Sequence, residues 1–153
     1  MNESKLMIVQ VIAIPLTLLL VATICDLRNR EVPDWVSLAM LAWGIAATSF
    51  GINNVGWIGL LLGLLFGFAI SAVVFYLGGL GGADVKLIAA TGAVVGPVAL
   101  LFVLFWMALA GGALALVAAA RGQRDYAYVP AITAGFVAYL FYPGGLWQHL
   151  FQA

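Results

Sequence analysis

Two aspartates in this sequence lie where a carboxylate is costly to keep. Asp26 directly follows a long apolar run, and Asp84 follows a glycine-rich segment at residues 78–83. Ionisable groups at a membrane are expensive and are functional candidates by default. Two carboxylates that share a site cannot both ionise easily, so the pair holds one proton. One member can then activate a water while the other protonates a carbonyl oxygen, which is metal-free and cofactor-free peptide hydrolysis.

Each aspartate also has a simpler interpretation. Asp84 is a good N-cap for a helix that starts at Val85. Asp26 can simply end the first helix, with its charge balanced by Arg28 and Arg30. From the residues alone, both the catalytic and the structural interpretations stay open.

Other polar residues have weaker claims. Asp34 precedes Trp35 and follows a proline, which indicates a capping role at a helix start. Lys86 is either an orientation signal or a group that tunes the carboxylates. Cys25 adjoins Asp26, but the only histidine, His149, is expected on the opposite membrane face, so a Cys–His nucleophile is not expected.

The composition identifies the elements that must position these groups. The chain has 153 residues, of which 65% are hydrophobic and 8% charged, and its mean hydropathy is +1.15. A soluble domain carries about 25% charged residues, so an integral membrane protein is predicted. Six basic and six acidic residues give no basic excess for nucleic acid. The single cysteine excludes an internal disulfide and a Cys-x-x-Cys zinc site.

The uncharged runs predict six membrane-spanning helices in one all-α domain covering residues 1–153. A crossing needs about 20 apolar residues. Residues 6–25 fit one crossing, retained rather than cleaved as a signal peptide; 35–83 fit two, with a turn at 50–56. Residues 87–120 fit two, broken at Gly96-Pro97, and 126–153 fit one crossing and a tail. In that tail, Trp147 and Phe151 are expected near an interface.

Helix parity then predicts the topology. With these crossings, the charged groups at residues 26–34, 84–86 and 121–125 share one membrane face, together with five of the six basic residues. The positive-inside rule makes that face cytoplasmic and leaves both termini outside. Gly59, Gly63 and Gly67 recur every four residues, a spacing that permits close helix packing.

Two motifs resemble the signatures of the type IV prepilin peptidases, a family of aspartic membrane proteases. Asp26-Leu-Arg-Asn-Arg-Glu-Val-Pro-Asp34 before an apolar helix is similar to the first signature. Gly81-Gly-Ala-Asp-Val-Lys-Leu87 is similar to the second, Gly-x-Gly-Asp followed by Val-Lys-Leu. The order and spacing of the two match as well. A weaker likeness is Tyr128-Val-Pro-Ala-Ile-Thr-Ala-Gly135, which is similar to a proline-containing segment of the last helix.

The resemblance implies that Asp26 and Asp84 are the catalytic pair of an endopeptidase that removes prepilin leader peptides at the cytoplasmic face of the inner (plasma) membrane. It makes Gly81, Gly82, Lys86 and Pro130 secondary candidates for shaping the site or binding substrate. No cofactor and no metal are expected. The precursor peptide and the lipid bilayer are the expected partners, and a homo-oligomer is possible.

The chain also departs from the family pattern. Larger members carry a segment with paired cysteines that binds zinc, and they methylate the new N-terminus. This chain has one cysteine, so it looks like the small peptidase-only type of Tad/Flp pilus systems, without methyltransferase activity; archaeal preflagellin peptidases are the close alternative. Ala83 stands at a glycine position of the second signature, and Ala127 and Val129 stand where proline and glycine often occur.

Two other classes remain as competitors. A small transporter or channel would use the aspartates as ion or proton ligands and would place an acidic residue near the bilayer midplane. A non-catalytic subunit of a secretion machine would allow the two carboxyl groups to lie far apart.

Overall fold

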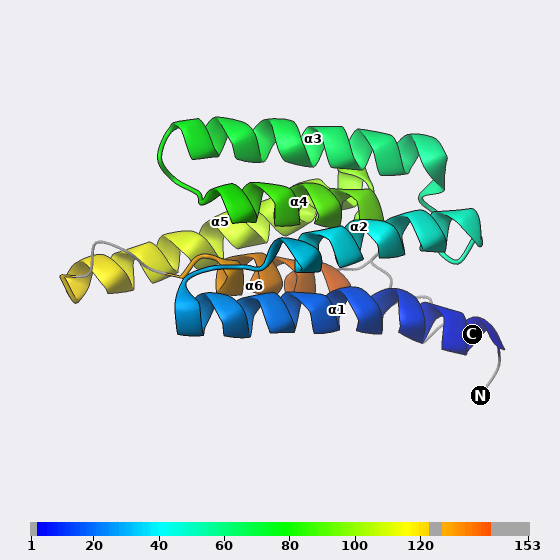
Figure 1. Ribbon diagram of the computed structural model, residues 1–153, viewed down its shortest axis with the longest axis horizontal. Coiled ribbons are helices and arrows are strands. Elements are labelled where there is room, and N and C mark those ends of the chain that lie inside the picture. The colour runs from blue at the N-terminus through cyan, green and yellow to red at the C-terminus, as the bar shows by residue number, and fades with distance from the viewer. Residues whose placement is uncertain (1–2, 123–126, 142–153) are drawn as a thin grey trace.

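The structure is a computed structural model that describes residues 3–122 and 127–141, with side chains described from residue 12 onwards. These residues form six helices and no strand, as Figure 1 shows. The helices are α1 (Glu3–Asn29), α2 (Asp34–Ser49), α3 (Gly56–Tyr76), α4 (Gly82–Val95), α5 (Pro97–Ala120) and α6 (Val129–Leu140). The predicted all-α fold and the number of helices are confirmed for this part of the chain.

Consecutive helices run in opposite directions along the long axis of the bundle (Figure 1). The C-terminal ends of α1, α3 and α5 and the N-terminal ends of α2, α4 and α6 therefore lie at the same end. This is the end that carries residues 26–34, 84–86 and Arg121, and we call it the charged end. The predicted gathering of these charged groups is confirmed for the described residues, whereas Arg124 and Asp125 lie outside them.

The predicted breaks between helices are also found. Helix α2 ends at Ser49 and α3 begins at Gly56, so the turn lies within residues 50–56. Helices α4 and α5 are separated only by Gly96, whose φ of 81° favours glycine. Pro97 follows at the first position of α5, where the missing N–H has no partner to lose.

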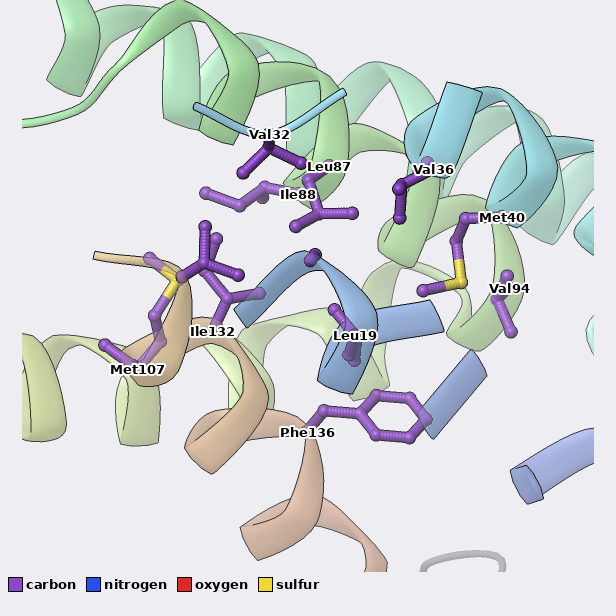
Figure 2. Close-up of a cluster of buried hydrophobic side chains, with 14 of the residues drawn as sticks. Leu19, Val32, Val36, Met40, Leu87, Ile88, Val94, Met107, Ile132 and Phe136 are labelled. Atoms are coloured by element: carbon purple, nitrogen blue, oxygen red, sulfur yellow. The ribbon is translucent and has the colours of Figure 1, made fainter. Parts of the chain in front are cut away.

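Helix α4 is the centre of the bundle. Every residue from Asp84 to Val95 except Lys86 is buried, as expected for a short helix that is apolar around its whole circumference. Its side chains meet those of four other helices in the core shown in Figure 2. Labelled there are Leu19 of α1, Val36 and Met40 of α2, Leu87, Ile88 and Val94 of α4, Met107 of α5, Ile132 and Phe136 of α6, and Val32 of the α1–α2 loop.

Glycines allow α3 to lie directly against α4. A Cβ at Gly63 would collide with the carbonyl oxygen of Gly92, and a Cβ at Gly92 would collide with that of Gly63. One turn along α3, a Cβ at Gly67 would stand 3.0 Å from the carbonyl oxygen of Ile88. The four-residue glycine spacing is thus used for close backbone approach, as predicted.

The six predicted membrane crossings are not all supported by helix length. Three helices of the described chain are long and apolar enough to cross a membrane: α1 from Ile12 to Asn29, α3 and α5. At 16, 14 and 12 residues, α2, α4 and α6 are shorter than the roughly 20 residues that a perpendicular crossing needs. Large apolar side chains such as Leu65, Phe105 and Leu116 are exposed on α3 and α5, a pattern suited to lipid contact.

Candidate active site

Asp26 lies in the last turn of α1 and not beyond it, because the helix continues to Asn29. The residue is only 8% exposed. Its Oδ2 accepts a hydrogen bond of 2.9 Å from the backbone N–H of Val129, the first residue of α6. The carboxyl group of α1 is therefore fixed by a helix more than a hundred residues later in the chain.

Asp84 is the third residue of α4 and is also 8% exposed. Its Oδ2 accepts a 3.0 Å hydrogen bond from the backbone N–H of Gly81, which precedes the helix. The sequence also allowed Asp84 a purely structural role at a helix start. Asp84 does have such a role, because it accepts from the free N–H of Gly81 at the start of α4. The predicted helix start at Val85 is wrong: α4 begins at Gly82, and this earlier start places the carboxyl in the first turn.

The two aspartates interact. Burial raises the pKa of Asp84 from the ordinary 3.8 to about 6, the hydrogen bond from Gly81 opposes this rise, and the negative charge of Asp26 adds to it. Asp84 lies at the start of α4, outside the three helices long enough to cross a membrane. Two carboxyl groups from helices α1 and α4 are therefore close enough for one to disfavour ionisation of the other. Such a pair can hold one proton near neutral pH.

Two glycines, Gly81 and Gly82, come shortly before Asp84 at the start of α4. Gly81 and Gly82 are exposed, and Gly81 has an extended backbone (φ −80°, ψ 157°). A Cβ at Gly81 would stand 3.2 Å from Oδ2 of Asp84, whereas one at Gly82 would meet only Phe75 at 3.9 Å. Ala83 is helical, so the alanine at this position fits without a positive φ.

The other two secondary candidates, Lys86 and Pro130, have no described contact with either carboxyl. Nζ of Lys86 is 2.8 Å from Oδ1 of Asp34, and both side chains are more than half exposed. The predicted helix start is found, but Pro33 occupies the N-cap position and Asp34 is the first residue of α2, so Asp34 is not the N-cap. Pro130 is the second residue of α6 and directly follows Val129.

Sequence reasoning missed the contribution of α6. In the sequence Val129 stands out only as a departure from the family pattern, yet its backbone N–H donates to Asp26. A second contact joins the same helices, where Oγ1 of Thr23 is 2.7 Å from Oγ1 of Thr133. The available signal was Pro130, because proline just inside a helix start marks a helix N-terminus whose N–H groups need acceptors.

No three His, Cys, Asp or Glu side chains within residues 12–122 and 127–141 are close enough together to hold a metal ion. Cys25 is half-buried and is not part of a disulfide. His149, Trp147 and Phe151 lie outside the described residues.

Comparison with known proteins identifies the family. Residues 13–116 match the family model described as the type IV leader peptidase family, and the chain belongs to that family. It is similar to the prepilin leader peptidase/N-methyltransferase of Bacillus subtilis (strain 168), with 32% identity over 133 residues. The match covers 82% of this chain and 53% of that protein, so the chain spans about half of the relative's length. No solved structure gives a significant match.

The match confirms the family resemblance carried by the two motifs. The family-model match ends at residue 116, before α6, so it includes Asp26 but not Val129. The relative's name includes a methyltransferase activity; that this chain lacks one stays a prediction, as do the roles of the individual site residues. The position of both aspartates at the charged end, and their mutual interaction, count against the transporter and non-catalytic classes.

Proposed function

We propose that this protein is an aspartic endopeptidase that removes the leader peptide from type IV prepilin-like precursors of the Tad/Flp kind. The observation that carries the proposal is the raised pKa of Asp84, about 6, at a buried site that also holds Asp26. A carboxyl group that titrates near neutral pH beside a second carboxylate is suited to acid–base work. Family membership supports a leader peptidase over other hydrolases.

In the proposed mechanism, Asp84 carries the proton because its burial disfavours the charge. Asp26 removes a proton from a water, whose oxygen attacks the carbonyl carbon of the scissile peptide bond. Asp84 donates its proton to the carbonyl oxygen. The tetrahedral intermediate then collapses as Asp26 passes its proton to the leaving nitrogen and Asp84 recovers one from the hydroxyl, so the pair returns to its starting state.

The primary test uses the protein in detergent micelles with a precursor that has a glycine before its apolar helix. Asp26→Asn and Asp84→Asn are each expected to lower the cleavage rate by more than a thousandfold, as for removal of an essential acid or base. Glu31→Gln is the matched control, because Glu31 lies in the exposed loop after α1. Normal cleavage by either aspartate variant would refute the proposal.

The same assay tests the predictions about metal and substrate. A chelator is expected to leave the rate unchanged, because the proposed pair needs no metal; loss of activity that zinc restores would contradict this mechanism. We expect faster cleavage of a Flp-type pilin precursor than of an archaeal flagellin precursor. The reverse order would favour the archaeal alternative.

We further propose that Gly81, Gly82, Lys86 and Pro130 contact the substrate. Lys86 is the sharpest case, because it follows Asp84 by two residues on α4 and its side chain is more than half exposed. Lys86→Met is expected to raise KM several-fold and to leave kcat within twofold, which is the pattern for lost ground-state binding. An unchanged KM would contradict substrate binding by Lys86, whose described interaction would then be the ion pair with Asp34.

The proposed side of cleavage is cytoplasmic. The charged end carries Arg28, Arg30, Lys86 and Arg121, a bias that the positive-inside rule assigns to the cytoplasm. The test introduces Glu31→Cys at this end or Asn54→Cys at the other end into a Cys25→Ser background. A membrane-impermeant maleimide added to intact cells should label the Asn54→Cys variant and spare the Glu31→Cys variant. The opposite labelling would place the site outside.

A further inference from the structure

The end of α1 that carries Asp26 is joined to α6 by two contacts that lie one turn apart, and the first of them is made by Asp26 itself. At the charged end, the N–H of Val129 donates to Oδ2 of Asp26. One turn further into the bundle, Oγ1 of Thr23 lies 2.7 Å from Oγ1 of Thr133. The residues are spaced by three on α1 and by four on α6, so each helix presents both contacts on one face. The helices are antiparallel, and the two contacts form successive rungs between them.

We call the contact between Thr23 and Thr133 the threonine rung, and its hydrogen bond has a defined direction. Oγ1 of Thr133 also lies 3.3 Å from the carbonyl oxygen of Leu19, to which only the hydroxyl can donate. Because a hydroxyl has a single proton, Thr133 then accepts from Thr23. The hydroxyl of Thr133 thus bridges a side chain and a backbone carbonyl of α1. This arrangement fixes both the distance and the rotation of α6 relative to α1.

In the first turn of α6, a single N–H group makes the contact with Asp26. Pro130 has no N–H, and the N–H of Ala131 donates to the carbonyl oxygen of Tyr128. The N–H of Val129 is the one that reaches Asp26. On its other side, α6 rests against α5, where a Cβ at Gly111 would stand 2.7 Å from the hydroxyl oxygen of Tyr128. The start of α6 is therefore held from two helices.

We propose that Thr133, acting with Thr23, is a positioning residue for the catalytic carboxyl of Asp26. The Thr23–Thr133 contact sets the place of the Val129 N–H, which engages Oδ2 of Asp26 and so holds the carboxyl in one orientation. This inference rests on the proposed peptidase function. It assigns a role to α6 that does not require α6 to touch the substrate.

The test measures kcat and KM of purified variants in micelles with the precursor used above. Thr133→Val keeps the side-chain shape and removes the hydroxyl. We expect kcat to fall about tenfold with KM within twofold, because a small displacement of a catalytic group lowers the rate without weakening substrate binding. Thr133→Ser restores the hydroxyl and is expected to recover at least half of the wild-type kcat.

Thr91→Val is the matched control. Thr91 is another buried threonine, but its hydroxyl donates to the carbonyl oxygen of Leu87 within the same helix. We expect its kcat to stay within twofold of wild type. Thr23→Val removes the same rung from the α1 side and serves if Thr133→Val folds poorly. The double variant should be no slower than the slower single variant, because each single variant already removes the Thr23–Thr133 hydrogen bond.

The outcomes separate this inference from the function on which it rests. If the wild type does not cleave, or if Asp84→Asn still cleaves, the proposed function fails. If those behave as expected but Thr133→Val and Thr23→Val keep the wild-type kcat, the positioning role is wrong. It is equally wrong if Thr133→Ser is as slow as Thr133→Val, or if Thr91→Val loses as much activity as either.

Discussion

The buried carboxyl of Asp84 is expected to weaken the fold at the pH where the protein works. Its pKa is raised from 3.8 to about 6, so the folded protein binds the proton of Asp84 more tightly than the unfolded chain does. The stabilisation by the proton is complete below pH 3.8 and is lost as the pH rises through about 6. Each pKa unit is worth about 1.4 kcal/mol, so the loss by pH 8 is about 2–3 kcal/mol.

Asp84→Asn removes this dependence, because the amide is neutral at every pH and its oxygen can still accept from the N–H of Gly81. We expect the variant to be inactive and yet more stable than wild type at pH 8, by about 2–3 kcal/mol or about 5–10 °C in Tm. The advantage should shrink as the pH falls towards 4. The assay follows tryptophan fluorescence on heating in one detergent at pH 4, 6 and 8.

The matched control is Asp34→Asn, which neutralises an exposed aspartate in an ion pair with Lys86. Exposed pairs of this kind are worth less than about 1 kcal/mol, so a Tm difference that grows by several degrees with pH is not expected there. A Tm difference between Asp84→Asn and wild type that is the same at pH 4 and pH 8 would refute the reasoning. Burial of the charged carboxylate would then carry no cost, and the case for a shared proton would lose its basis.

Two further predictions concern glycines. Gly81→Ala places a Cβ 3.2 Å from Oδ2 of Asp84; we expect a several-fold fall in kcat and a smaller effect of Gly82→Ala, whose Cβ meets only a ring atom at 3.9 Å. Equal rates for the two variants would show that the carboxyl tolerates displacement. Gly92→Val drives a side chain into the backbone of α3, and we expect a loss of stability of at least about 3 kcal/mol, read as a fall in Tm or in folded yield. Gly112→Ala is its control, because a Cβ there meets nothing within 4 Å; a normal Tm for Gly92→Val would contradict the close crossing.

Helix boundaries were predictable where a local signal sets them. Gly96-Pro97 ends one helix and starts the next because a positive φ and a missing N–H act on the residues themselves. The first helix was predicted to end at Cys25, but it continues to Asn29, because charged side chains at a helix end are compatible with helical backbone. The six crossings were inferred from run lengths, yet α2, α4 and α6 are short. An uncharged run also includes turn residues that belong to no helix, so its length overestimates the length of the helices within it.

The sequence was enough to select the two candidate aspartates, but it did not show that they lie close together. Asp26 and Asp84 were identified by their positions after an apolar run and a glycine-rich segment. Nothing in those patterns determines how far apart the carboxyl groups lie, since that distance depends on α4 fitting into the centre of the bundle. Pro130 marks a helix start whose N–H groups need acceptors, but the choice of Asp26 as the acceptor for Val129 depends on the packing of α6 against α1 and is not encoded locally.

The sequence by itself determined the apolar helices, the breaks between them and the gathering of charges at one end. These follow from composition and from local backbone chemistry, which act within a few residues. Only the tertiary structure decided that Asp84 is buried beside Asp26, that α6 holds Asp26 and that Lys86 pairs with Asp34. Each of these depends on side chains and backbone groups brought together through space, where burial and neighbouring charges set the chemistry of a carboxyl group.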